Sequence, residues 1–291
     1  MKIERLDGPF GARITGAAPG SISDGVAKEL VDALFEHRVL LVEGGEDLPK
    51  ADYASFGRLF GKPLEFFMAD HLDNAFPELI WISNSPDVPL SQRDGAGFWH
   101  TDGSYEHLPA TVTMLYGVEV PDQGGETKFI DTAAAYDALD DAMKAQIDGL
   151  QVWHGLVRDT RTEEEVERVK LDPVFAEKQA REQFSHPMVL PHPVTGRKTL
   201  YSPSGSPFGV VGMEEAEGRA LLDTIKAHCL QPQFRNTIKC GRGDILIWDN
   251  LSTMHSATPT EYTLEDGKRR ALMRISTTGL PPAYSGLAAP F

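Results

Sequence analysis

The segment Phe98–Gly103 reads FWHTDG and carries a histidine and an aspartate, His100 and Asp102, one residue apart. Side chains alternate along an extended segment, so these two point to the same side. A second histidine, His255, ends the stretch WDNLSTMH at residues 248–255. Two imidazoles and one carboxylate that leave the opposite face of the metal open are the ligand set of non-haem Fe(II) oxygenases. These three residues are therefore predicted to bind one metal ion.

The segment KRRALMRIS at residues 268–276 supplies a second pattern. Its alternation predicts a strand with Arg270 and Arg274 on one face and Met273 and Ile275 on the other. Guanidinium groups match carboxylates in bidentate geometry, so the two arginines are predicted to capture anions beside the metal. A basic edge strand, on which cations only block unwanted pairing, is the alternative interpretation.

Together these segments resemble the Fe(II)/2-oxoglutarate-dependent dioxygenases of the taurine dioxygenase (TauD/TfdA-like) family, which includes phenoxyalkanoate herbicide dioxygenases. The resemblance runs from about Leu6 to Gly279, and its landmarks follow the order of the family. They are Arg38–Val42, Phe60–Pro63, Trp99–Asp102, Gly124–Thr127, His192–Lys198, Gly243–His255 and the arginine strand. The resemblance therefore covers nearly the whole chain.

The resemblance implies the same three metal ligands, with Fe(II) as the metal, 2-oxoglutarate as cosubstrate and O2 as oxidant. It implies that Arg270 and the hydroxyl of Thr127 bind the distal carboxylate of 2-oxoglutarate. Arg274 would hold an anionic group of the primary substrate. Two departures stand out: residues 64–68 lack the histidine that the taurine enzyme supplies to its sulfonate, and Leu251 replaces a usual arginine. Taurine itself is therefore not implied as the substrate.

Aromatic walls with a few polar groups are typical of small-molecule sites. The candidate pocket residues are Phe67, Asn84, Gly103, Tyr105, Trp153 and Phe208. Aromatic residues in a β-rich core more often serve packing alone. Each of these candidates is accordingly a weaker prediction than the metal ligands.

Composition restricts the class of protein. The chain has 291 residues, 41% of them hydrophobic, and a net charge of −15. Such a charge repels nucleic acid and anionic membranes, so the predicted partner is a small organic anion that arginines capture at short range.

No apolar run approaches the roughly 20 residues that span a bilayer, and Met1–Asp7 does not form a secretory signal. With two cysteines, Cys229 and Cys240, outside any metal or disulfide pattern, a cytoplasmic enzyme is predicted. Whether it forms a homo-oligomer stays open.

The pattern of elements favours a mainly β fold with flanking helices. Helices are predicted at 25–37, 51–60, 133–147 and 213–230, and strands at 111–120, 126–130, 151–157, 199–202, 244–248 and 271–276. The resemblance sharpens this to a double-stranded β-helix, or jelly roll, with helical insertions, formed by residues 1–291 as a single domain. The charged stretch at about 160–183 is either a lid inserted into this domain or a solvated surface excursion.

Three functions compete at this point. The first is the dioxygenase, which would oxidise a C–H bond of a carboxylate, sulfonate or sulfate by hydroxylation, with or without fragmentation of the product. The second is a zinc hydrolase that uses the same triad, because catalytic zinc also takes three protein ligands and a water. The third is a non-catalytic binding module. Arg270 with Thr127 favours the dioxygenase, because a hydrolase needs no clamp for a dicarboxylate.

Overall fold

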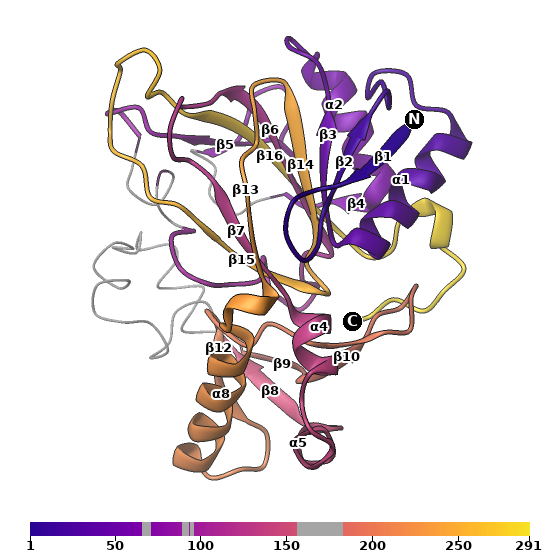
Figure 1. Ribbon diagram of the computed structural model, residues 1–291, viewed down its shortest axis with the longest axis vertical. Helices are drawn as coiled ribbons and strands as arrows, with labels where there is room; N and C mark the ends of the chain where they lie inside the picture. The colour runs from indigo at the N-terminus through magenta and orange to yellow at the C-terminus, as the bar shows by residue number, and fades with distance from the viewer. Residues whose placement is uncertain (66–70, 89–92, 94–95, 156–182) are drawn as a thin grey trace.

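The centre of the fold is a pair of β-sheets (Figure 1). This computed structural model describes residues 1–65, 71–88, 93, 96–155 and 183–291. The larger sheet has eight strands: β1 (Lys2–Arg5), β2 (Ala12–Thr15), β3 (Val39–Glu43), β14 (Asp244–Asp249), β6 (Val112–Glu119), β16 (Ala271–Thr278) and β4 (Lys62–Pro63) in this order, with β5 (Ile80–Ser83) paired to β16. The smaller sheet has three: β13 (Arg235–Ile238), β7 (Thr127–Asp131) and β15 (Thr253–Ala257). All pairings except that of β2 with β3 are antiparallel within these two sheets.

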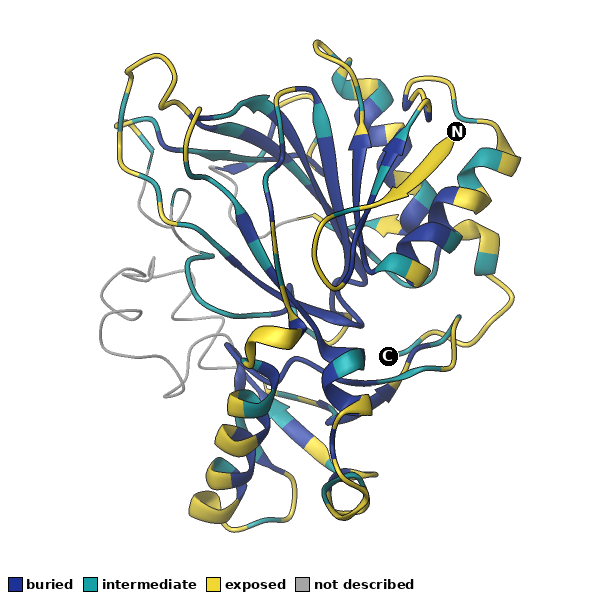
Figure 2. Ribbon diagram, in the orientation of Figure 1, coloured by how far each residue is buried: buried dark blue, intermediate teal, exposed yellow. Residues whose placement is uncertain are grey.

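Alternating residues of the larger sheet pack into two different apolar clusters. In β14, Ile245 and Ile247 join the cluster beneath the helices α1 (Asp24–His37) and α2 (Lys50–Gly57). Leu246 and Trp248 join the cluster that also contains Phe129 of the smaller sheet. The period of two thus separates an outer face covered by helices from an inner face between the sheets, and both are buried (Figure 2).

A second group of elements packs against the outer face of the smaller sheet. It contains the strands β8 (Gln151–His154), β9 (Phe184–Pro187), β10 (Val189–Pro191), β11 (Lys198–Leu200) and β12 (Pro207–Val210). Its helices are α4 (Thr132–Asp137), α5 (Asp141–Ile147) and α8 (Glu215–Cys229), with a short 3-10 turn at Pro232–Phe234. Two further 3-10 turns, Arg58–Phe60 and Pro282–Tyr284, lie instead beside α1. Ile130 and Met254 share an apolar cluster with Leu222 and Ile225 of α8. This group forms the lower part of the molecule in Figure 1.

The β-rich core with flanking helices has the predicted architecture, with one error in the helices. The single helix predicted at 133–147 is two helices, because Asp140 caps a new one: its side chain accepts a hydrogen bond from the Met143 amide at 2.7 Å. The insertion at about 160–183 falls almost wholly within residues 156–182, outside the described residues. The single domain with this insertion stays a prediction.

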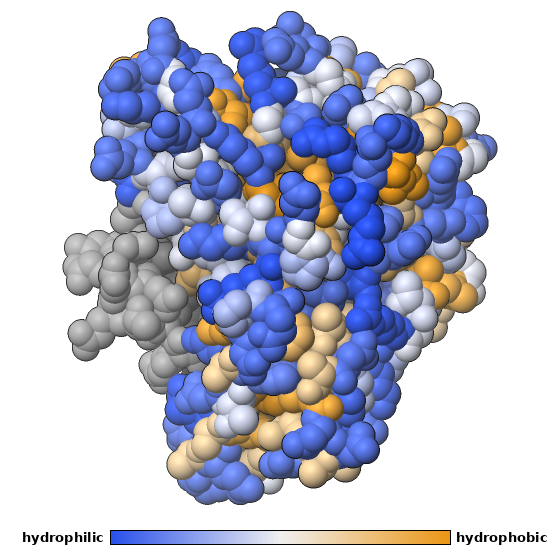
Figure 3. All heavy atoms as spheres, in the orientation of Figure 1, coloured by the Kyte–Doolittle hydropathy of each residue, from blue (hydrophilic) through white to orange (hydrophobic). Residues whose placement is uncertain are grey.

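The surface matches the polar composition. On the face shown in Figure 3, hydrophilic side chains dominate and hydrophobic ones form small scattered patches. Among the described residues, no helix has the length and apolar character needed to cross a membrane.

Candidate active site

The two histidines of the predicted triad meet in an antiparallel bridge. The amide of His100 donates to the carbonyl of His255 at 3.0 Å, and the amide of His255 donates back at 2.9 Å. This paired geometry puts the two imidazoles on one side, with ring centroids 4.2 Å apart. The predicted extended segment is thus a single bridge at His100, and a turn begins at Asp102.

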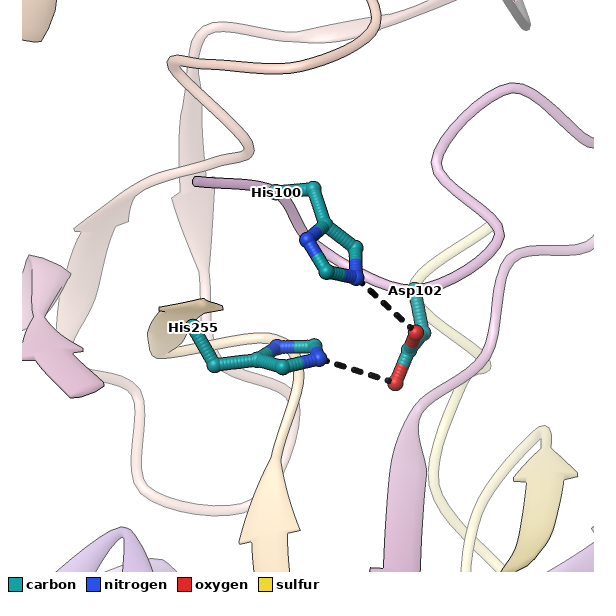
Figure 4. Close-up of side chains that lie close together, drawn as sticks. All are labelled: His100, Asp102 and His255. Atoms are coloured by element: carbon teal, nitrogen blue, oxygen red, sulfur yellow. Dashed lines mark ion pairs between the residues drawn. The ribbon is translucent and has the colours of Figure 1, made fainter. Parts of the chain in front are cut away.

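Asp102 faces the two imidazoles from one side, with one carboxylate oxygen toward each (Figure 4). Its Oδ1 is 3.6 Å from Nε2 of His100, and its Oδ2 is 3.6 Å from Nε2 of His255. One ligand atom from each of the three residues can be chosen so that all lie within 4.8 Å of one another. The structure therefore brings together the three residues that the sequence singled out, from positions 155 residues apart at the extremes, 100 and 255.

The orientation of His100 is set by its own segment. Its Nδ1 lies 2.8 Å from the carbonyl oxygen of Phe98. A carbonyl oxygen can only accept, so Nδ1 carries the proton and Nε2 presents its lone pair toward Asp102. Ligating histidines commonly donate the other ring N–H to a carbonyl in this way. The imidazole is thus held in the tautomer that a metal requires.

Burial and neighbouring charges set the ionisation of the site. Burial alone would raise the pKa of Asp102, but the adjacent Arg274 guanidinium opposes it, and that pKa lies well below its usual range. Burial, helped by His100, lowers the pKa of His255 to about 3. At neutral pH the site thus offers an ionised carboxylate and an uncharged His255, which are the forms that bind a metal.

An unsatisfied acceptor tests whether a metal fits. Oδ2 of Asp102 is buried and has no hydrogen-bond partner among the described residues. Buried polar atoms normally have partners, so an unpaired carboxylate oxygen beside two imidazoles calls for a cation. Two nitrogen donors and one hard oxygen donor suit Fe(II). The residues present fit this metal.

Arg274 of β16, and Arg270 just before that strand, approach the site from the larger sheet. Leu272 packs between the sheets and Met273 on the outer face, so Arg270 and Arg274 share the inner face with Leu272, as predicted. Nη2 of Arg274 contacts Oδ1 of Asp102 at 2.9 Å. Arg270 is only 4% exposed, and a Cβ placed on Gly125 would lie 3.7 Å from its Cδ.

Thr127 faces the same interior from the smaller sheet. It shares a face of β7 with Phe129, which belongs to the apolar cluster between the sheets. It is 4% exposed and follows the turn that brings Gly125 close to Arg270. Of the two residues expected to bind 2-oxoglutarate, Thr127 is thus in the smaller sheet and Arg270 at the end of a strand of the larger one, and both are buried.

Comparison with known proteins agrees with this geometry. The family model described as "Taurine catabolism dioxygenase TauD, TfdA family" matches residues 2–276. The chain belongs to this family. It is 31% identical to an (S)-phenoxypropionate/alpha-ketoglutarate-dioxygenase of Sphingobium herbicidovorans, over 98% of each chain. An alkylsulfatase of Acinetobacter baylyi is 28% identical, over 96% of this chain and 85% of the relative.

Solved structures agree as well. The crystal structure of AAD-2 in complex with Mn(II) and N-oxalylglycine superposes with a TM-score of 0.75 at 28% identity, covering 97% of this chain and 98% of that one. A putative alpha-ketoglutarate-dependent taurine dioxygenase from Burkholderia xenovorans gives a TM-score of 0.77 at 26% identity, covering 99% and 94%. The predicted jelly-roll class is thereby confirmed. The TauD/TfdA chain is an Fe(II)- and 2-oxoglutarate-dependent dioxygenase, and the zinc hydrolase alternative falls away.

The predicted pocket residues of this TauD/TfdA chain lie in several places. Gly103 and Tyr105 belong to the turn that follows Asp102, and Tyr105 is half-buried. Phe208 in β12 and Trp153 in β8 are also half-buried, on paired strands of the lower group. Phe67 lies outside the described residues. Their contact with substrate stays a prediction.

Asn84 is placed differently from the expectation. It is 2% exposed, and its side chain bonds the main chain of Glu261, Lys268 and Arg270. Both hydrogens of its Nδ2 are therefore used within the protein, whereas a pocket residue would offer them to substrate.

Sequence reasoning missed Gly205. Its φ is +94°, and a Cβ there would lie 2.8 Å from Cβ of His100 and 3.0 Å from the carbonyl oxygen of Trp99. The segment around Gly205 therefore packs directly on the backbone of the metal-ligand segment. Its surroundings, SPSGSP at 202–207, look like an ordinary polar turn, so only the folded chain shows the contact.

Proposed function

We propose that this enzyme oxidises a C–H bond of a small organic anion, and that Arg274 binds the anionic group. The observation that carries the proposal is the placement of Arg274, whose Nη2 lies 2.9 Å from a carboxylate oxygen of the triad. Its Nε is buried and has no hydrogen-bond partner among the described residues. A guanidinium with one edge on Asp102 and an open N–H beside it supports capture of a substrate anion next to the metal.

In this proposal the triad His100, Asp102 and His255 holds Fe(II). When bound there, the metal supplies the activation of dioxygen that couples the decarboxylation of 2-oxoglutarate to oxidation of the substrate. The protein orients the ligands and excludes water: the Phe98 carbonyl fixes the orientation of His100, and Asp102 is 5% exposed. Preorganised ligands of this kind need no rearrangement when the metal arrives.

Arg270 and Thr127 bind the distal carboxylate of 2-oxoglutarate in the same proposal. A charge-assisted hydrogen bond contributes about 1.5–3 kcal/mol, so a bidentate arginine accounts for a large part of the affinity. Arg270 is buried, where water competes little. Thr127 adds a neutral donor from the facing sheet, which fixes the direction of the cosubstrate.

The substrate class follows from the cation and from the relatives. The names of two relatives describe action on (S)-phenoxypropionate and on 2,4-dichlorophenoxyacetate, and a third is called an alkylsulfatase. Carboxylates and sulfate esters share an anionic head that Arg274 can hold. A hydroxyl placed on carbon next to an ether or ester oxygen then collapses to a carbonyl and releases the alcohol or sulfate, so hydroxylation and fragmentation are one reaction type here. Tyr105 and Phe208 are the proposed pocket walls.

The cytoplasm is the proposed compartment. Cys229 and Cys240 are buried free thiols, and burial raises the pKa of the Cys240 thiol to about 12. A reducing compartment suits a chain that keeps both thiols unpaired.

Three arginine variants test the proposal. Arg270→Ala should raise the Kd for 2-oxoglutarate at least about tenfold, because a desolvated carboxylate loses its partner. This can be followed anaerobically through the visible charge-transfer band of the Fe(II)–cosubstrate chelate. Arg274→Ala should weaken the primary substrate about tenfold or more in a screen of carboxylates, sulfonates and sulfate esters, read as succinate formation above background.

Arg269→Ala is the matched control. Arg269 precedes Arg270, but its side chain is 44% exposed and pairs with Glu119 at the surface. It should change neither binding constant. An Arg270→Ala enzyme with wild-type affinity for 2-oxoglutarate would remove the assigned role, and an Arg274→Ala enzyme with wild-type substrate affinity would remove the anion site.

A further inference from the structure

Asn84 stands at the point where two strands stop pairing regularly. It follows β5, whose Ser83 pairs with Ala271 of β16. The next step of the ladder would pair Asn84 with Arg270, and half of that pair forms: the Asn84 amide donates to the Arg270 carbonyl at 3.1 Å. The return bond to the Asn84 carbonyl is not made, because that oxygen accepts from the amide of Thr263 at 3.0 Å.

The Asn84 side chain takes over the missing bond. Its Oδ1 accepts from the amide of Arg270 at 2.7 Å. Asn84 therefore binds both main-chain groups of Arg270, although the Asn84 carbonyl is itself bonded to Thr263. On the other side of β16 the register with β6 shifts between Ala271 and Leu272, so that ladder is irregular at the same point.

The side-chain amide of Asn84 also joins the two ends of a loop. Nδ2 of Asn84 donates to the carbonyls of Glu261 and Lys268 at 3.0 and 2.9 Å. Both residues lie in the loop that links β15, which carries His255, to β16, which begins directly after Arg270. Asn84 is 2% exposed and Arg270 is 4% exposed, so the Asn84 end of these bonds and the Arg270 amide are shielded from water. Without the Asn84 side chain, the buried Arg270 amide would lose its partner, and the carbonyls of Glu261 and Lys268 would lose their bonds within the protein.

We propose that Asn84 is a positioning residue for the 2-oxoglutarate site, and acts through the main chain of Arg270. A guanidinium holds a carboxylate bidentately only within a narrow range of position and direction. The Arg270 side chain starts from a backbone whose N–H and C=O are both set by Asn84. The inference rests on the proposed function, since it requires Arg270 to bind the cosubstrate.

Asn84→Ala tests it, with anaerobic titration of the Fe(II)-loaded variant by 2-oxoglutarate as the readout. The Kd should rise about tenfold, as is usual when a residue that orients a ligand-binding group is lost. The KM for the primary substrate and the Mn(II) affinity should stay within about twofold of wild type, because the bonds of Asn84 reach neither the triad nor Arg274. Asn84→Ser, which is smaller in its effect on folding but too short to bridge both carbonyls, should show the same selective change.

Asn236→Ala is the control for general loosening. Its Nδ2 also bridges two carbonyls, those of Asp7 and Phe10 at 3.1 and 2.6 Å, and its Oδ1 accepts an amide, that of Thr237 at 2.8 Å. It should lower stability and leave the cosubstrate Kd unchanged. Equal Kd values in the Asn84 and Asn236 variants, with Arg270→Ala impaired, would overturn the role of Asn84 alone. An unimpaired Arg270→Ala would overturn the proposed function together with it.

Discussion

Among the described residues, two buried groupings of histidine and aspartate can be compared, and only the first leaves a carboxylate oxygen open to a metal. In the first, Asp102 faces His100 and His255; in the second, His192 Nε2 lies 3.3 Å from Oδ2 of Asp249. Both aspartates are at most 5% exposed. Residue types and burial are therefore alike in the two places.

The difference lies in the hydrogen bonds that remain to be made. Oδ1 of Asp249 accepts from the Leu251 amide at 2.9 Å, and its Oδ2 accepts from the Ser252 hydroxyl. Nδ1 of His192 accepts the amides of Val194 and Thr195, so the proton of the ring is on the nitrogen that faces Asp249. Oδ2 of Asp102, in contrast, has no donor among the described residues. A carboxylate with donors on both oxygens cross-links the chain, whereas one with an oxygen that lacks a donor can bind a cation.

The largest effect should follow from Asp102→Asn. The amide keeps the shape of the side chain and loses the negative charge, so Mn(II) affinity should fall at least about a hundredfold and oxidation of substrate should cease. The measurement is the rise in Tm on adding Mn(II): a ligand at 100 times its Kd adds about 2.7 kcal/mol to wild type. A variant that keeps this rise would show that Asp102 is not a ligand.

Asp249→Asn is the matched counterpart. It weakens charge-assisted bonds to Leu251 and Ser252, so the free energy of unfolding should fall by about 2 kcal/mol and Tm by roughly 4–8 °C. The rise in Tm on adding Mn(II) should remain. Loss of that rise in both variants would mean that the two groupings form one functional unit, and the contrast drawn between them would fail.

The contrast also shows what a sequence can predict here. His100, Asp102 and His255 were identifiable because the chemistry of a metal needs particular residue types in a particular order. Alternation along residues 270–274 predicted the shared face of Arg270 and Arg274 because alternation is a local property. The partner of His192, in contrast, is 57 positions away, between residues 192 and 249. No local pattern records which carboxylate will find its donors within the protein.

Asn84 and Gly205 show the same limit. An asparagine near an expected pocket fits a substrate ligand as well as a main-chain clamp, and only its contacts with Glu261 and Lys268 separate the two. Gly205 must be a glycine because the segment Trp99–His100, 105 positions earlier in the chain than Gly205, approaches its Cα. Asp140 could have been found, because a capping residue is a local signal that the helical periodicity overrode.

Gly205→Ala should have a smaller effect on metal binding than Asp102→Asn. It displaces the ligand His100 without removing it. The new Cβ meets Cβ of His100 at 2.8 Å and the Trp99 carbonyl at 3.0 Å, so the ligand segment must shift. Mn(II) affinity should fall about tenfold, measured by calorimetric titration.

Gly149→Ala separates this effect from backbone strain. Gly149 has a φ of +76°, and a Cβ there meets nothing within 4 Å. Both variants should lose about 1–2 kcal/mol of stability through the left-handed backbone. Only Gly205→Ala should lose metal affinity, and equal affinities in the two would show that the close approach at His100 has no consequence for the site.

The smallest effect concerns His154, a buried histidine whose pKa no acidic side chain of the described residues shifts. It is fully buried, its Nδ1 lies 2.8 Å from the Ser206 hydroxyl, and its Nε2 has no partner among the described residues. Burial, with the neighbouring His186, lowers its pKa well below the usual value. Nε2 of His154 is thus unpaired among the described residues, as Oδ2 of Asp102 is. Unlike Asp102, His154 carries no negative charge, and its burial disfavours protonation.

The sign of the pH dependence follows. Above about pH 6.5 both the folded and the unfolded chain keep His154 neutral, and its contribution to stability is complete. As the pH falls below that value, only the unfolded chain takes up the proton, and stability is lost by up to about 1.4 kcal/mol per pH unit. His154→Asn keeps a polar atom for Ser206 and cannot be protonated, so urea unfolding of the metal-free variant should depend less on pH between 7.5 and 5.5. Replacing the exposed His107 by Asn should leave the wild-type slope. A slope identical to that of wild type would contradict the assignment of the acid sensitivity to His154. The Mn(II)-induced rise in Tm should persist in His154→Asn. That result would show that an unpaired buried atom makes a metal site only where ionised and neutral donors converge on it.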